Sequence, residues 1–148
     1  MYDRATTANA VKAASEKQGW DLQYHSLAQI EHAIGHFDAL WDPEDRRLSR
    51  PLTQEEHRFI QNERKLCALD FRDYWLPRYA WIVNYEKQAV RFTANVAQQI
   101  VMDLWAEREA QALAIWMQQL KARRLGVSTI SEMAVQHRFQ FHSYSNCV

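Results

Sequence analysis

The nine residues Lys121-Ala122-Arg123-Arg124-Leu125-Gly126-Val127-Ser128-Thr129 decide which fold the sequence predicts. Before them, the apolar run of residues 112–120 predicts a buried strand, and after them residues 130–139 predict a helix. A strand, a short basic loop with one glycine, and a helix that opens on Ser-Thr form the layout of a phosphate-binding loop. The stretch therefore predicts an α/β fold that binds a nucleotide at this loop.

The chemistry of such a loop comes from backbone N–H groups at a helix N-terminus, a close-approaching glycine, a hydroxyl for Mg²⁺ and a lysine for the β/γ-phosphates. The usual pattern is Gly-x4-Gly-Lys-[Ser/Thr]. Here Gly126 and Ser128 take their usual places, but Val127 replaces the lysine. Lys121 stands instead at the first position, from which its ammonium could fold over the loop. The alternative is a basic strand-to-helix turn that binds no ligand.

The loop resembles the Walker A loop of tailed-bacteriophage terminase large subunits, the ATP-driven motors that pack DNA into capsids. It is similar to a subset in which the lysine has moved to the front of the loop, although Arg124 stands where many members have glutamine. Residues 92–98, Phe-Thr-Ala-Asn-Val-Ala-Gln, resemble an upstream element whose glutamine contacts adenine. Residues 71–82 resemble the aromatic helix that precedes this element. The resemblance covers roughly residues 64–148.

The resemblance implies the N-terminal part of a P-loop NTPase, an αβα sandwich, of which this part is mostly helical with few strands. Residues 1–52 would form an N-terminal helical segment, and residues 53–148 the first part of the ATPase domain, before its Walker B strand. Catalytic roles would fall to Lys121 and Arg124, with Arg123 or Arg124 sensing the γ-phosphate, and Ser128 would hold Mg²⁺. The residues expected to bind ATP are Gln98, Lys121, Ala122, Arg123, Arg124, Leu125, Gly126, Val127, Ser128 and Thr129.

The same resemblance implies partners and a location. The partners would be double-stranded DNA, the portal protein and the terminase small subunit, with several copies of the chain assembled on the portal. The protein would work in the host cytoplasm and transiently at the procapsid portal. This part alone is expected to bind ATP without hydrolysing it, because the acidic Walker B residues and the nuclease would follow it. Two alternatives are another P-loop ATPase of helicase type, and a non-enzymatic helical interaction module.

Composition limits these possibilities. The 148 residues carry 18 basic and 18 acidic side chains, so net charge gives no argument for nucleic acid. Only three glycines and three prolines against six tryptophans suit a helix-rich domain with aromatic packing. Cys67 and Cys147 match no metal-binding spacing and are expected to be reduced thiols. No apolar run approaches twenty residues, so neither export nor a membrane span is expected.

Helix starts can be predicted from capping residues. Ser26 should open one helix, Thr53 with Glu56 should open a long one as a capping box, and Asn95 should open a third. The second helix should continue through Trp75 until Pro77 kinks or restarts it. The third should turn Val96, Ile100, Val101, Leu104 and Trp105 towards a sheet and leave Gln98 off that apolar line.

Three further predictions concern short features. Residues 85–92 predict a short strand or hairpin. Tyr79 and Trp81 are candidates to flank the adenine, against the alternative that the whole aromatic row is core. His32 and His36 lie one helical turn apart and could bind zinc, but without a third ligand nearby they are expected to be ordinary surface or half-buried histidines.

Overall fold

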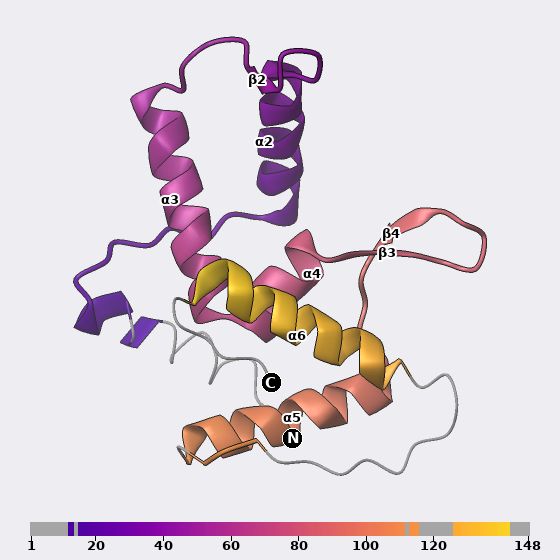
Figure 1. Ribbon diagram of the computed structural model, residues 1–148. Coiled ribbons are helices and arrows are strands. Elements are labelled where there is room, and N and C mark those ends of the chain that lie inside the picture. Colours follow the sequence, from indigo (N-terminus) through magenta and orange to yellow (C-terminus); the bar gives the residue numbers. More distant parts are fainter. Residues whose placement is uncertain (1–11, 14, 112, 116–125, 143–148) are drawn as a thin grey trace.

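Helices make up most of the part of the chain that the structure, a computed structural model, describes: residues 12–13, 15–111, 113–115 and 126–142 (Figure 1). In chain order the elements are α2 (Leu27–Leu40), β1 (Trp41–Asp42), β2 (Arg47–Leu48), α3 (Gln54–Leu69), the π-helix η1 (Phe71–Trp75), α4 (Leu76–Tyr79), β3 (Trp81–Val83), β4 (Ala89–Arg91), α5 (Val96–Ala110) and α6 (Val127–Phe141). A mostly helical chain with few strands was expected, and the described residues agree with that content.

The helices start where their capping residues predict. The Ser26, Thr53 and Asn95 side chains each accept a hydrogen bond from the backbone N–H three residues later, and each belongs to a complete capping box. In the α3 box, the Glu56 carboxylate in turn accepts a hydrogen bond of 2.6 Å from the Thr53 N–H. These three predictions are confirmed. They could be made from the sequence because a cap depends on residues only three positions apart.

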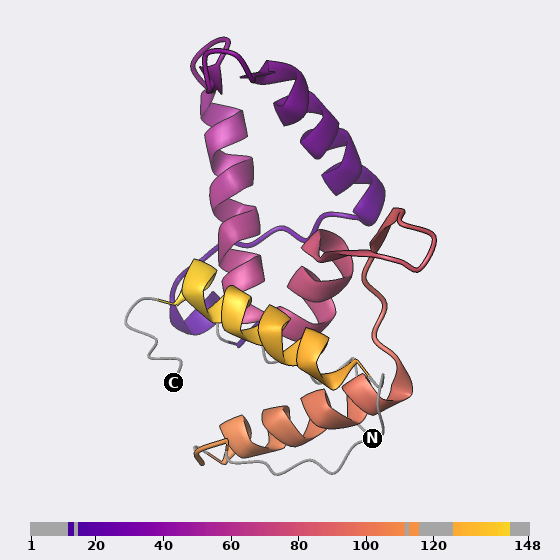
Figure 2. The same cartoon turned by 45° about the vertical axis from the view of Figure 1, so that its right-hand side comes forward.

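The helices form an arm, made of α2 and α3, and a base, made of η1, α4, α5 and α6. Helices α2 and α3 stand side by side, with the short β1–β2 pair in the connection between their upper ends (Figures 1 and 2). The ring centroids of Phe37 on α2 and Phe59 on α3 lie 6.2 Å apart. Helix α6 crosses the lower end of α3, and α5 lies against α6. The β3–β4 hairpin projects to one side, and the chain then returns from it to α5. The strand β4 falls within residues 85–92, where a short strand or hairpin was predicted, but its partner β3 begins earlier, at Trp81.

The core lies where α3, η1, α5 and α6 meet. Its residues are mostly large and apolar, so their burial supplies most of the free energy that stabilises the base. The buried cluster consists of Leu66, Cys67, Tyr74, Trp75, Leu76, Ala80, Phe92, Val101, Met102, Val127, Ile130 and Met133. Burial raises the pKa of the Cys67 thiol, so this free cysteine is an inert core residue.

The long helix predicted after Thr53 ends at Leu69, earlier than expected. Asp70 interrupts it, because its buried carboxylate accepts a hydrogen bond from the Asp73 N–H at 2.8 Å and so begins the π-helix η1. This π-helix buries Tyr74 and Trp75, and Pro77 then lies in the first turn of α4. The break therefore comes from an aspartate cap as well as from the proline.

The strand predicted for residues 112–120 is wrong where the structure describes it. Residues 113–115 belong to no strand, and the side chains of Leu113 and Ile115 are exposed at 47% and 42%. A strand needs a neighbour for its backbone hydrogen bonds. The strands of the described residues pair only within two antiparallel hairpins, β1 with β2 and β3 with β4. Residues 112 and 116–120 lie outside the described residues, and the P-loop sandwich stays a prediction.

The apolar face predicted for α5 is only partly right. Val101 is buried and Trp105 packs against the core, but Val96, Ile100 and Leu104 are exposed at 73%, 54% and 44%. The buried side instead carries Gln98, Val101 and Met102. The apolar residues of α5 lie on two faces of the helix, and the contact with α6 decides which face is buried.

His137 joins α6 to α3, and its neutral form fits this place. Its Nε2 lies 2.6 Å from the Cys67 carbonyl oxygen, and its ring is packed among Phe71, Trp75 and Phe141. Burial lowers the pKa of His137 below its usual value, and the nearby His142 and Arg138 lower it further. The unfolded chain therefore binds a proton to this imidazole more readily than the folded protein does.

Acid should consequently destabilise the protein through His137. This contribution to the stability is complete above about pH 6.5, the pKa of an unperturbed histidine, and is lost as the pH falls through the lower folded-state pKa. Urea unfolding of the wild type should show a larger loss of stability from pH 7.5 to pH 5 than that of His137→Gln. Burial raises the pKa of Asp70, so this carboxyl group changes the stability in the opposite direction as the pH falls. Its contribution cancels in the comparison because both proteins contain it. An equal loss in both proteins would contradict the prediction, and exposed His32→Gln is the control.

Candidate functional site

The start of α6 falls inside the stretch that the sequence singled out. Gly126 is the N-cap residue, with φ 70° and ψ 13°, and α6 runs from Val127 to Phe141, which confirms the predicted helix. A left-handed φ of this size favours glycine. Because glycine has no side chain, the cap residue makes no side-chain hydrogen bond to the first turn. In that turn Val127 is buried, Ser128 is exposed and Thr129 is half-buried.

The start of α5 is the second part of the site. The Asn95 carboxamide oxygen accepts a hydrogen bond from the Gln98 N–H at 3.0 Å. The Gln98 carboxamide oxygen accepts one from the Asn95 N–H at 2.9 Å. The two residues thus satisfy two of the donors that a helix N-terminus leaves unpaired.

The Gln98 side chain brings the two parts together. Its Nε2 donates a hydrogen bond of 2.8 Å to the carbonyl oxygen of Gly126, a residue 28 positions away in the sequence. Figures 1 and 2 both show α5 and α6 running beside each other with their N-termini at the same end. The structure therefore joins the element predicted to contact adenine directly to the glycine of the predicted phosphate loop.

Gln98 is more enclosed than the sequence predicted. Its side chain is 4% exposed, and both ends of its carboxamide have partners within the chain. In this arrangement the amide is turned towards the backbone of the two helix starts. Its predicted contact with adenine stays a prediction. The fallback, Gln99, is exposed and donates from Nε2 to the Ala94 carbonyl oxygen at 3.0 Å.

The packing of α5 against α6 holds this end of the molecule in place. Val127 and Ile130 of α6 are buried in the same cluster as Val101 and Met102 of α5. Further along the two helices, Arg138 of α6 and Glu109 of α5 form an ion pair. Both ion-pair residues are about half exposed, so the apolar contact contributes more to the packing than the pair does.

Five of the predicted site residues cannot be placed. Lys121, Ala122, Arg123, Arg124 and Leu125 lie outside the described residues, so their predicted roles stay predictions. The described residues contain no group of three or more His, Cys, Asp or Glu side chains arranged to hold a metal ion. A P-loop holds Mg²⁺ through one hydroxyl and the phosphates themselves, so Ser128 as a Mg²⁺ ligand also stays a prediction.

Both aromatic candidates for an adenine contact have partners elsewhere. The Tyr79 hydroxyl donates to Glu63 Oε2 at 2.5 Å. Trp81 is half exposed on β3, and the Arg91 guanidinium lies over its ring at 4.8 Å from the centroid. These contacts hold both rings in their observed positions.

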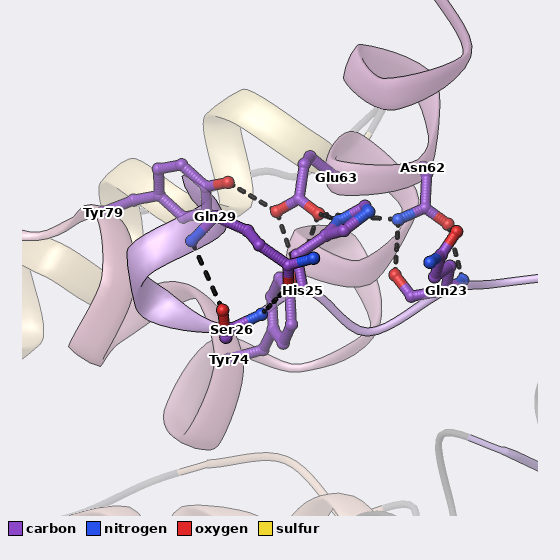
Figure 3. A network of polar contacts seen from close by, with 8 residues as sticks. All are labelled: Gln23, His25, Ser26, Gln29, Asn62, Glu63, Tyr74 and Tyr79. Atoms are coloured by element: carbon purple, nitrogen blue, oxygen red, sulfur yellow. Dashed lines mark hydrogen bonds and ion pairs between the residues drawn. The ribbon is translucent and has the colours of Figure 1, made fainter. Parts of the chain in front are cut away.

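A buried carboxylate, which sequence reasoning missed, organises the junction of the arm and the base (Figure 3). Glu63 of α3 accepts hydrogen bonds from the hydroxyls of Tyr74 and Tyr79, at 2.9 and 2.5 Å. His25 Nδ1 lies 2.5 Å from its Oε1. The neighbouring Asn62 is hydrogen-bonded to the backbone of Gln23 through both ends of its amide. The segment before α2 is thereby attached to α3 and α4.

A signal for this carboxylate exists in the sequence. Glu63 lies four residues after Phe59 and three before Leu66, which places it on the apolar side of α3. A charged residue on a buried face needs hydrogen-bond donors around it. Burial, together with the charge and hydrogen bonds of Glu63, raises the pKa values of Tyr74 and Tyr79, so both tyrosines stay protonated donors.

Of the two histidines on α2, His36 has a partner within the protein, as expected of an ordinary surface or half-buried histidine. His36 Nε2 lies 2.6 Å from Glu56 Oε1, a carboxylate that Arg50 also binds at 2.7 Å. Hydrogen bonds from Arg50, His36 and Thr53 lower the pKa of Glu56. This cluster, in which the Glu56 side chain is only 12% exposed, links the upper ends of the arm, and His32 is exposed on α2.

No family model, no curated protein and no solved structure matches the chain. In the part of the chain that the structure describes, no helix is long and apolar enough to cross a membrane.

Proposed function

We propose that this chain binds Mg·ATP at the start of α6, as the front part of a phage terminase large subunit, the motor that hydrolyses ATP to package viral DNA. The observation that carries the proposal is the 2.8 Å hydrogen bond between Gln98 and the Gly126 carbonyl oxygen. An adenine-contacting element and a phosphate-binding loop must lie together to hold one nucleotide. The two elements were recognised separately in the sequence, and this contact supports their forming one site.

The start of α6 also has the chemistry that a phosphate needs. The N-cap residue offers no side-chain acceptor, so a phosphate oxygen can take the place that a serine or aspartate cap usually fills. The helix dipole adds a partial positive charge at the same point. Lys121, Arg123 and Arg124 would bring cationic groups, and Ser128 would hold the Mg²⁺ ion. With such a clamp, the catalytic roles of Lys121 and Arg124 are positioning and charge stabilisation during phosphoryl transfer.

The rest of the motor is proposed by resemblance. Hydrolysis would require the complete protein, with its Walker B acid, and packaging would require double-stranded DNA, the portal protein and the terminase small subunit. Several copies of the chain would work together at the procapsid portal in the host cytoplasm. The isolated chain should therefore be tested for nucleotide binding and not for turnover.

A second candidate is a non-enzymatic helical interaction module, and one observation favours it. Val96, Ile100 and Leu104 form an apolar row along the outer side of α5, exposed at 73%, 54% and 44%. An exposed row of this kind is typical of a surface that another protein covers. Such a module would need no nucleotide.

Isothermal titration with Mg·ATP separates the two functions. We expect wild type to bind, Lys121→Ala to bind at least about tenfold more weakly because a charge-assisted contact is lost, and exposed Lys17→Ala to match wild type. Circular dichroism would confirm that each variant is folded. No binding by a folded wild type would contradict the ATP site and favour the interaction module.

A further inference from the structure

The Gln98 side chain serves two helices at once. It is the third-residue member of the capping box of α5, and its Nε2 is bonded to the N-cap residue of α6. A capping box uses only the side-chain acceptor at its third position. The bond to Gly126 is therefore additional to the needs of α5, and its consequence lies in α6.

The bond reaches the peptide from which α6 begins. The Gly126 carbonyl oxygen that accepts from Gln98 also accepts the Ile130 N–H at 3.2 Å, which is the first hydrogen bond of the helix. A Cβ placed on Gly126 would lie 2.6 Å from Gln98 Nε2, so the amide and this backbone are in close contact. The orientation of this one peptide sets the direction in which the first-turn N–H groups of α6 point.

We propose that Gln98 is a positioning residue that fixes the first turn of α6, and that it couples base binding to phosphate binding through that turn. The second statement rests on the proposed function. A carboxamide is planar, so a ligand that moves its oxygen end also moves its nitrogen end and, with it, Gly126. Gln98 would thus act on the phosphates without touching them.

The substitution Gln98→Glu isolates the bond to α6. Glutamate keeps the acceptor for the Asn95 N–H and is itself a favoured residue in a capping box. It replaces the Nε2 donor with an oxygen that faces the Gly126 carbonyl oxygen, so the bond to α6 is lost. Gln99→Glu adds the same charge one residue further on, where the side chain is exposed, and is the matched control. Gln98→Met removes the donor without adding charge, although it also removes the acceptor for the Asn95 N–H, which Gln98→Glu keeps.

Two measurements test the two statements on the full 148-residue chain. Amide hydrogen exchange at Ile130, whose N–H makes the first hydrogen bond of α6, reports the stability of the first turn without any ligand. Binding of Mg·tripolyphosphate, which has no base, reports whether the loss of Gln98 reaches the phosphates. A residue that only contacted adenine would change the affinity for ATP and leave that for tripolyphosphate unchanged.

We expect the Ile130 amide to exchange about tenfold faster in Gln98→Glu and Gln98→Met than in Gln99→Glu, and the two Gln98 variants to bind tripolyphosphate about tenfold more weakly, the usual effect of one lost hydrogen bond. Equal exchange in Gln98→Glu and Gln99→Glu would overturn the positioning role. Faster exchange with unchanged tripolyphosphate affinity would overturn the coupling and leave the positioning role standing. Faster exchange with no binding of tripolyphosphate or ATP by wild type would support the positioning role and refute the coupling together with the proposed function.

Discussion

Replacing Glu63 with alanine should destabilise the protein by about 3–5 kcal/mol, the range found when one member of a buried charged network is removed. The hydroxyls of Tyr74 and Tyr79 and the ring of His25 would all lose the carboxylate that they contact. Each buried donor left without an acceptor adds to the cost, and the methylenes of Glu63 leave a gap in addition. Urea unfolding at pH 7, followed by circular dichroism, measures the change.

Three further variants separate the causes. Tyr79→Phe removes one donor and leaves Glu63 its other partners, so a loss of only about 1 kcal/mol is expected. Glu63→Gln retains an acceptor oxygen and should fall between the two. Glu132→Ala removes an exposed glutamate from α6 and should change stability by less than about 0.5 kcal/mol. A Glu63→Ala variant as stable as Glu132→Ala would show that the network contributes nothing to the fold.

The parts of the fold that sequence could predict are those decided within a few residues. The caps at Ser26, Thr53 and Asn95 and the helix after Gly126 follow from local hydrogen bonds and backbone preferences. The early end of α3 was missed for a local reason too, because Asp70 could equally have stayed an exposed helical residue. Its cap becomes favourable only when the π-helix it begins can bury Tyr74 and Trp75.

The missed features depend on neighbours that are distant in sequence. The partner of Glu63 in the segment before α2, His25, is 38 residues away, and no periodicity reveals such a pair. The same limit applies to α5, where two apolar rows competed and the packing of α6 selected Val101 and Met102. Gln98 was placed on the wrong side for this reason, and its predicted role at the site came from the resemblance of residues 92–98 to the adenine-contacting element.

The second large effect is expected at Gly126. Its replacement by alanine should cost about 2–3 kcal/mol, because a left-handed backbone costs a non-glycine residue about 1–2 kcal/mol and a displaced Gln98 loses a hydrogen bond of about 1 kcal/mol. The new Cβ would lie 2.6 Å from Gln98 Nε2. That atom is the end of a flexible side chain, but it can retreat only by releasing the Gly126 carbonyl oxygen. Thermal and urea unfolding of Gly126→Ala measure the cost.

The other two glycines make the test specific. Gly19 also has a positive φ, of 65°, but a Cβ added there would meet no atom within 4 Å. Gly19→Ala should therefore lower the stability only by the backbone cost of about 1–2 kcal/mol. Gly35 lies inside α2 with open space around it, and Gly35→Ala should stabilise the protein by about 0.5–1 kcal/mol. The excess of Gly126→Ala over Gly19→Ala then measures the contact with Gln98. That excess should vanish in a Gln98→Met background, because the bond it reports is already absent there. An excess that persisted unchanged in that background would place the strain in the backbone of α6 and not in the link between the two helix starts.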